Sequence, residues 1–183
     1  MIGAAFGDTL ARAQAGDERA FACLFRDVQP ALVRYLRVIT PDAEDVASET
    51  WLQVVTGLAG FRGQEDAFRA WLFTIARHRA ADAGRSRTRR PVVPLAAEEL
   101  PEPPISPDAA DLALEAISAR AVVAVIATLP PDQAEIIMLR VVAGLDAGDV
   151  AKIVGKTPGA VRVAAHRGLR RLAGQVAQAG VTL

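Results

Sequence analysis

The stretch from residue 145 to residue 172 constrains the fold more than any other part of this sequence. Ala151 is followed by Gly155 four residues later and by Val161 ten residues later. A helix-turn-helix needs a small residue where its helices touch, a glycine that turns the chain and an apolar residue that anchors the second helix. The spacing therefore predicts a helix-turn-helix.

Residues with capping chemistry precede both helices of this motif. Asp146 can cap the first helix, and Thr157 followed by Pro158 is typical of the start of the second. The second helix then carries one histidine and four arginines: His166, Arg162, Arg167, Arg170 and Arg171. Such a helix can enter a DNA major groove and hold phosphates. A helical hairpin with a solvated basic face is the alternative for this segment alone, because turn and cap signals are individually common.

The composition indicates an all-α protein. Of the 183 residues, 51% are hydrophobic and only 5% are aromatic, and no alternating strand pattern recurs. The longest apolar run, 121–127, is too short to span a bilayer, and residues 1–7 lack the features of a signal peptide. Cys23 is the single cysteine, so an internal disulfide is excluded. We expect Cys23 to be a small core residue. A chain with a single cysteine also fits a reducing cytoplasm.

Charge is segregated along the chain although the net charge is zero. Residues 62–90 carry eight basic and three acidic side chains, and residues 119–183 carry eight basic and four acidic ones. Between them, residues 91–118 hold six acidic side chains and no basic ones. Two basic blocks separated by an acidic one are typical of a protein that contacts a polyanion at two places.

Helical periodicity predicts two helices in the first sixty residues. The first covers residues 17–39, and the second runs from a break at residues 40–42 to about Leu58. For the second helix we expect a core face made of Val46, Leu52, Val55 and Leu58. We expect its opposite face to be acidic, with Asp42, Asp45 and Glu49 at helical spacing.

A glycine-rich loop around Phe61 and Arg62 separates these helices from a third, predicted for residues 67–85. The third helix is expected to bury Phe68, Trp71, Leu72 and Ile75, and to present Arg69, Arg77, His78 and Arg85 outward. These three helices form a predicted first domain of residues 1–90.

A proline-rich acidic segment, residues 91–111, predicts an extended linker. Helical periodicity resumes at about Leu112, and prolines at 130 and 131 open a further helix that Gly144 ends before the helix-turn-helix. The second predicted domain therefore covers residues 112–183, of which we expect the last four to be frayed.

Several of these segments resemble, in order, the motifs of bacterial RNA polymerase sigma factors of the extracytoplasmic-function (ECF) group. They are DAEDVASETWLQV (42–54), FRGQEDAFRAWLFTIARHRAADAGR (61–85), the proline-rich linker, and LPPDQAEIIMLRVVAGLDAGDVAKIVGKTPGAVRVAAHRGLRRL (129–172). The resemblance covers residues 17–173. It implies a first domain like sigma region 2, a second like sigma region 4, and the work of a promoter-specificity subunit that recognises and helps melt promoter DNA.

The resemblance also assigns site residues. The recognition helix would bind the minus-thirty-five element through Thr157, Pro158, Gly159, Ala160, Arg162, Val163, His166 and Arg167. The first domain would bind the minus-ten element through Phe61, Arg62, Gly63, Arg77, His78 and Arg85, with the Phe61 loop trapping a flipped base. Phenylalanine closing a helix pair is more often core than a stacking platform, so both roles stay open for Phe61. His78 stands where many members have asparagine, and Ala164 and Ala165 replace a frequent Arg-Leu pair.

The implied partners are core RNA polymerase, through its β′ clamp helices and β flap, double- and single-stranded promoter DNA, and an anti-sigma factor. The acidic face of Asp42, Asp45 and Glu49 would dock on the clamp helices, although an ordinary solvated face explains the same residues. We expect a cytoplasmic protein that is not an enzyme, with no catalytic constellation, no metal site and no cofactor. A self-standing helix-turn-helix regulator, whose first domain binds an effector or dimerises, is the alternative function.

Overall fold

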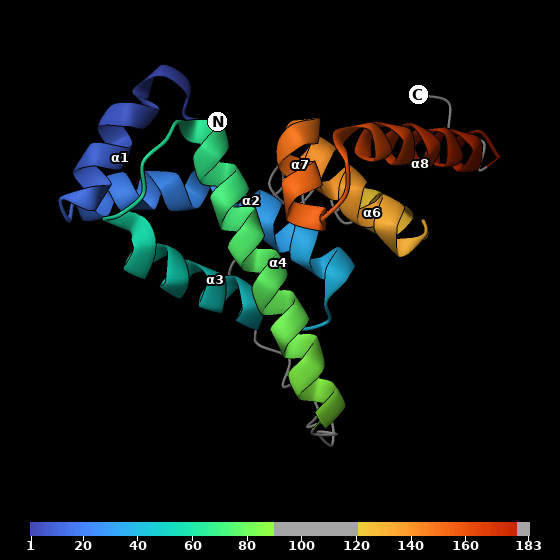
Figure 1. Ribbon diagram of the computed structural model, residues 1–183, viewed down its shortest axis with the longest axis horizontal. Helices are drawn as coiled ribbons and strands as arrows, with labels where there is room; N and C mark the ends of the chain where they lie inside the picture. The colour runs from blue at the N-terminus through green and yellow to red at the C-terminus, as the bar shows by residue number, and fades with distance from the viewer. Residues whose placement is uncertain (90–120, 179–183) are drawn as a thin grey trace, which may run out of the picture.

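The computed structural model describes residues 1–89 and 121–178, and these residues form two small helical domains (Figure 1). The first contains η1 (Gly3–Ala5), α1 (Phe6–Gln14), α2 (Glu18–Ile39), α3 (Ala43–Leu58) and α4 (Glu65–Arg89). The second contains a helical segment at 121–127, α6 (Pro131–Ile137), η2 (Met138–Val142), α7 (Ala147–Val154) and α8 (Pro158–Gln178). The all-α prediction is confirmed. The predicted linker at 91–111 and the frayed end at 180–183 lie outside the described residues.

The core of the first domain is built by α2, α3 and α4, at the predicted places in the sequence. Helix α2 buries Leu24, Leu32 and Tyr35 completely, and the Tyr35 ring meets Phe73 of α4 edge-on with centroids 5.4 Å apart. Phe68 of α4 is also buried, as its apolar spacing predicts. Aromatic pairs of this kind add to the stabilisation that burial supplies.

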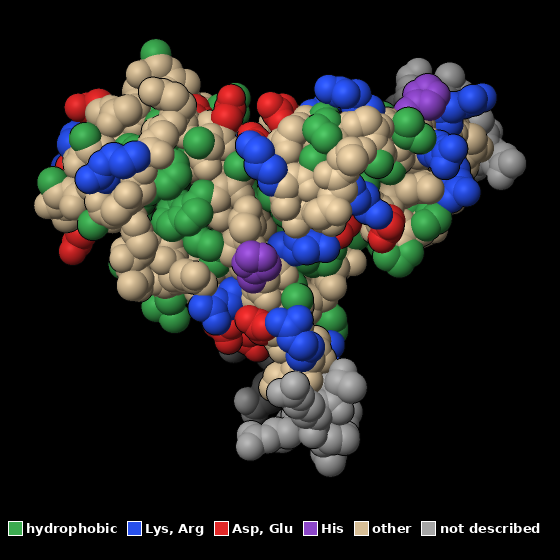
Figure 2. Space-filling model, in the orientation of Figure 1, with side chains coloured by type: hydrophobic (Ala, Val, Ile, Leu, Met, Phe, Trp, Pro, Cys, Tyr) green, Lys and Arg blue, Asp and Glu red, His purple; other side chains and the backbone are tan. Residues whose placement is uncertain are grey.

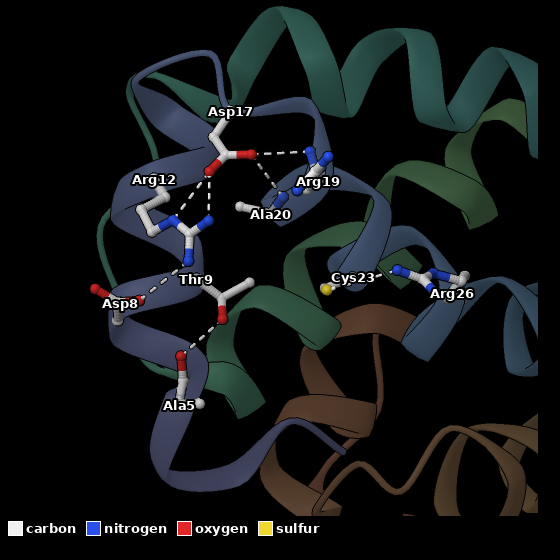
Figure 3. Close-up of polar contacts among 9 residues, drawn as sticks. All are labelled: Ala5, Asp8, Thr9, Arg12, Asp17, Arg19, Ala20, Cys23 and Arg26. Atoms are coloured by element: carbon white, nitrogen blue, oxygen red, sulfur yellow. Dashed lines mark hydrogen bonds and ion pairs between the residues drawn. The ribbon is translucent and has the colours of Figure 1, made fainter.

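Helix α1 precedes the predicted elements and meets α2 at a polar corner (Figure 3). Asp17 caps α2 by accepting bonds from the backbone N–H groups of Arg19 and Ala20, at 2.9 and 3.1 Å. Its other carboxylate oxygen accepts from Arg12 of α1, at 2.9 Å from Nε. The Arg12 hydrogen bond is the main reason that the pKa of Asp17 lies below its usual range.

The predicted core face of α3 is partly wrong. Leu52 and Val55 are 69% and 55% exposed, whereas Trp51 and Val54 are buried. Trp51 lies against Phe25 of α2, with ring centroids 4.9 Å apart, and its indole N–H donates to the Gln29 side chain at 2.6 Å. Apolar side chains surround most of α3, so its packing against α2 decides which of them are buried.

Cys23 is also not in the core as predicted. It is exposed, and its Sγ lies 3.7 Å from a guanidinium nitrogen of Arg26, one turn further along α2 (Figure 3). The neighbouring Leu24 is fully buried. Successive side chains on a helix point about 100° apart, so the rotation that buries Leu24 turns Cys23 toward solvent.

The helix-turn-helix is confirmed, together with the helix caps and the glycine turn that the sequence predicts. Asp146 caps α7 by accepting from the backbone N–H groups of Gly148 and Asp149, at 2.6 and 2.8 Å. Gly155 ends α7 with φ +69°, a left-handed conformation that side chains disfavour. Thr157 Oγ1 accepts from the Ala160 N–H at 3.2 Å and caps α8.

The two helices of the motif touch where the sequence spacing places the contact. Ala151 is 4% exposed and Val161 is fully buried. Helix α8 also packs closely on α6: a Cβ added at Gly168 would come within 2.5 Å of Ile137 Cδ1. Glycine is therefore the residue that lets these two helices approach.

The two domains are in contact. Helices α2 and α4 of the first domain touch α6, η2 and α7 of the second, and buried side chains of both belong to one continuous cluster. In Figure 1, α2 passes behind α4 so that its C-terminal end lies beside the second domain, and α8 extends away from the first domain. The first domain therefore does not cover the outer side of α8.

Candidate nucleic-acid interface

Seven of the eight residues predicted for the minus-thirty-five site lie on α8, and the eighth, Thr157, directly precedes it. They are all exposed: Thr157, Pro158, Gly159, Ala160, Arg162, Val163, His166 and Arg167. Val163 is half exposed. An apolar group on such a face can contact a thymine methyl, while arginines bind phosphate or guanine.

The register of α8 explains this exposure. Val161 and Gly168 point toward α7 and α6 because they are seven residues apart, about two helical turns. Arg162 and Arg167 are each one position from an anchor and Arg170 is two positions from Gly168, so their side chains point about 100° to 200° away from the packed side, and all three are exposed. Figure 2 shows basic side chains gathered along the far end of this domain.

The predicted minus-ten residues on α4 lie in three different environments. Arg77 is partly buried, and its Nε donates to the Glu135 carboxylate of α6 at 2.8 Å. His78 is exposed. Arg85 is exposed and is paired with Asp82 one turn earlier. The prediction that Arg69 points outward is wrong: it is 6% exposed and faces the second domain.

The loop between α3 and α4 holds Phe61 in an aromatic stack. The Phe61 and Trp71 rings lie 5.1 Å apart at 26°, and Phe68 meets Phe61 edge-on at 5.6 Å. Arg62 folds back so that one guanidinium nitrogen donates to two backbone carbonyls, at 2.7 and 2.9 Å. A Cβ at Gly63 would lie 3.0 Å from the Phe61 ring, so glycine allows the loop to close over this ring.

The acidic face of α3 is also divided. Asp42 is ion-paired with Arg87 of α4, and its carboxylate accepts no hydrogen bond from the backbone N–H groups at the start of α3. Asp45 and Glu49 are exposed. The outward rotation of Leu52 places an exposed apolar side chain one turn beyond Glu49.

In the described parts of the chain, no three side chains with metal-binding chemistry come together. Across those same residues, every helix is too short or too polar to cross a bilayer.

Sequence reasoning missed the residues that join the domains. Arg69, Tyr35 and Glu135 meet the opposite domain through hydrogen bonds between residues 58 to 100 positions apart in the chain. Local periodicity carries no signal for such contacts, because each partner only completes its bond after both domains have folded. The exposed basic side chains of α8 and α4, on two helical domains of which one contains a helix-turn-helix, define the class of protein. It is a two-domain helical DNA-binding protein of the helix-turn-helix type.

Comparison with known proteins gives the family. Residues 24–90 match the Sigma-70 region 2 model, and residues 119–172 match the Sigma-70, region 4 model. The chain is 40% identical to the ECF RNA polymerase sigma factor SigD of Mycobacterium tuberculosis, over 98% of this chain and 88% of that protein. It is 36% identical to the ECF sigma factor ShbA of Streptomyces griseus, over 91% and 92% of the two chains.

Solved structures agree with this assignment. The sigma factor RpoE of Bartonella quintana, crystallised with the anti-sigma factor NepR, aligns with a TM-score of 0.58 and 25% identity. That alignment covers 83% of this chain and 93% of the RpoE chain. CnrH, solved with the cytosolic domain of CnrY, shares the fold with a TM-score of 0.61, covering 95% and 98%. The chain belongs to the ECF group of sigma-70 RNA polymerase sigma factors, and thus is a promoter-specificity subunit of RNA polymerase.

Proposed function

We propose that this subunit binds the minus-thirty-five element with α8, binds and helps melt the minus-ten element with α4 and its preceding loop, and docks on core polymerase through α3. The observation that carries this proposal is the pair of separate basic reading surfaces, one on each domain. A protein that reads one duplex site needs one such surface, whereas two serve elements at different positions. The chemistry of phosphodiester formation would belong to the polymerase.

In the second domain, we assign base contacts to the start of α8. Its first turn is exposed at Pro158, Gly159 and Ala160, whose small side chains let the helix approach base edges closely. Arg162 follows on the same face and is placed to bind a guanine or a phosphate. His166 and Arg167 lie one turn further along the helix and would bind phosphates of the DNA backbone.

In the first domain, the proposed role of Phe61 is to hold the base-trapping loop in place. Its ring would not itself stack on the flipped base. Its packing on Trp71 and Phe68 leaves it partly buried. Arg62 would supply positive charge after releasing its backbone carbonyls, and His78 and Arg85 would follow the strand along α4. Unstacking a base costs a few kcal/mol, which such contacts must offset.

The polymerase-binding surface that we propose is the exposed face of α3. It combines the carboxylates of Asp45 and Glu49 with the apolar side chains of Leu52 and Val55. An acidic face repels DNA but suits a basic protein partner, and central apolar groups contribute most to binding once desolvated. Asp42 stays a weaker candidate, because Arg87 already occupies its carboxylate.

An anti-sigma factor is proposed as a further partner, since the related RpoE of Bartonella quintana was crystallised with one. The cytoplasm is the proposed compartment, because the polymerase and the promoter are there.

Run-off transcription tests the proposal. Core polymerase freed of sigma factors is combined with the purified chain and a fragment library from the source genome. We expect discrete start sites that disappear with Asp45→Lys/Glu49→Lys. A control for charge reversal as such is Glu18→Lys, a single reversal at an exposed carboxylate of α2.

A self-standing regulator would behave differently. It would produce no start sites with core polymerase, yet would shift a specific duplex by itself, with a twofold-related site. That outcome would contradict the proposed function.

A further inference from the structure

Helix α1 supports the loop between α3 and α4, residues 59–64, although the match to the Sigma-70 region 2 model begins only at residue 24. Figure 1 shows this loop running alongside α1. The side-chain nitrogen of Gln14, the last residue of α1, lies 2.9 Å from the Leu58 carbonyl oxygen and 2.9 Å from the Phe61 carbonyl oxygen. A side-chain amide has two N–H donors, so Gln14 uses both of them on this loop.

These two bonds hold backbone groups that α3 leaves open at its end. The last four carbonyls of a helix have no partner within that helix, and α3 ends at Leu58. The Leu58 carbonyl accepts from the Phe61 N–H at 3.1 Å and also from Gln14, and these bonds fix the place where the chain turns. Gln14 is partly buried, so water has restricted access to the same carbonyls.

The N-terminal segment also holds the other end of the loop. The Glu65 carboxylate, in the first turn of α4, accepts bonds from the backbone N–H groups of Ile2 and Gly3, at 2.7 and 2.8 Å. Phe6 of α1 is 3% exposed, and its ring centroid lies 5.7 Å from that of Phe68, within the aromatic stack beside the loop. The loop is therefore tied to the N-terminal segment on both sides.

Arg62 shares one of the carbonyls that Gln14 binds. Its Nη1 donates to the Phe61 carbonyl at 2.7 Å and to the Ala59 carbonyl at 2.9 Å. In the proposed function, Arg62 leaves both carbonyls in order to bind DNA. The Phe61 carbonyl then keeps Gln14 as a partner, whereas a chain without this amide would leave it unpaired. An unpaired carbonyl with restricted access to water is unfavourable, so Gln14 lowers the cost of moving Arg62.

We propose that Gln14 is a positioning residue for the base-trapping loop: its amide keeps the Leu58 and Phe61 carbonyls bonded while Arg62 exchanges them for DNA. This inference rests on the proposed function. Because Gln14 acts on the loop and not on the DNA, its loss weakens the trapping of a base and leaves the phosphate contacts of α4 unchanged.

Two single-stranded probes separate base trapping from phosphate binding. Both are fluorescein-labelled oligonucleotides of equal length: one has a mixed base sequence, and the other is abasic throughout. Fluorescence anisotropy with the full chain gives the ratio of the two affinities, in which the general attraction to phosphate cancels. We expect Gln14→Met, which has a similar length but no N–H donor, to lower this ratio about fivefold with the affinity for the abasic probe unchanged.

The matched control is Gln133→Met, because the Gln133 side chain also accepts a hydrogen bond, from Arg171 at 3.2 Å within the second domain. It should keep the wild-type ratio. Gln14→Lys should restore the ratio, because an ammonium group has three N–H donors on a stem long enough to reach both carbonyls. Ala11→Lys, at an exposed position of α1, controls for the added charge and should raise both affinities alike.

A merely structural role for Gln14 would move different quantities. It would lower the thermal midpoint of Gln14→Met and its affinity for both probes by the same factor, and the ratio would not change. An unchanged ratio for Gln14→Met, or a lowered ratio that Gln14→Lys does not restore, would overturn the inference. A wild-type chain that binds both probes equally would overturn it as well.

Transcription separates this inference from the proposed function. If the wild type with core polymerase gives start sites, and Gln14→Met gives them in the same yield at limiting sigma, the positioning role is wrong and the function stands. If no chain gives start sites, but the ratio falls for Gln14→Met and returns for Gln14→Lys, the positioning role stands and the proposed function is wrong.

Discussion

Removal of the buried guanidinium of Arg69 should destabilise the protein strongly. Arg69 is 6% exposed and the Asp27 side chain is 14% exposed, so both charges are largely removed from water. Truncating one partner of such a pair costs about 3–5 kcal/mol, because the other charge stays buried without compensation. Loss of the bond to the Ala143 carbonyl adds about 1 kcal/mol.

Part of this cost is relieved, which places the expected value at the lower end. The amino group of Met1 lies 2.5 Å from the other oxygen of Asp27 and keeps some of that charge paired. We therefore expect Arg69→Met to lower the free energy of unfolding by about 3 kcal/mol, a large share of the total for a protein of this size. Arg69→Lys keeps the charge but cannot bond in two fixed directions, so about half of that loss is expected.

Urea unfolding followed by far-ultraviolet circular dichroism measures the effect. Arg26→Met, at an exposed arginine of α2, is the matched control and should change the free energy of unfolding by no more than about 0.5 kcal/mol. In a double-mutant cycle with Asp27→Asn, the two losses should be clearly non-additive. A loss below about 1 kcal/mol for Arg69→Met, or simple additivity with Asp27→Asn, would refute the reasoning.

Three further predictions concern single side chains. Burial first, and the Glu135 carboxylate second, raise the pKa of Tyr35 well above its usual range near 10, so the stability it contributes is complete below about pH 10 and is lost as the pH rises further. Because Tyr35 is the single tyrosine, tyrosinate absorbance should appear only when the chain unfolds in alkali, and reversible titration near pH 10 in the folded protein would contradict this. Gly57→Ala should lower the free energy of unfolding by about 0.5–2 kcal/mol in the same urea assay, because its Cβ would lie 2.8 Å from Trp71 Cζ2 in the aromatic stack, whereas Gly174→Ala, with open space around the new Cβ, should stabilise α8 slightly. Hydrogen bonds from the backbone of Asp149 and Gly148 lower the pKa of Asp146, so its capping contribution is present above about pH 4 and is lost as the pH falls through the lowered pKa. Asp146→Ala should accordingly lower the thermal midpoint at neutral pH more than Asp146→Asn does, and an equal effect of both at neutral pH would count against the cap.

Local chemistry made the helix-turn-helix predictable. Asp146, Gly155 and Thr157 act on backbone groups within a few residues of themselves, so their roles depend only on neighbouring sequence. The exposure of the reading face of α8 follows from the same register. The contacts that this face makes with DNA stay predictions.

Reasoning from local sequence failed where the burial of a side chain depends on which other helix packs against it. The periodicity of α3 suits more than one buried face, and the packing of Trp51 against Phe25 selected the face that leaves Leu52 and Val55 in solvent. Arg69 was expected outside because an isolated arginine favours water; its burial becomes favourable only when Asp27 and the Ala143 carbonyl are both in place.

The sequence by itself therefore determined the helices, their caps, the turn of the DNA-reading motif and membership of the family, because each of these follows from short-range backbone chemistry or from motifs along the chain. Only the tertiary structure decided which side of α3 is exposed, and that Glu135 reaches Arg77 and Tyr35 across 58 and 100 positions of sequence. Such bonds arise from the packing of whole helices, which depends on the combined shape and charge of surfaces that no local pattern contains.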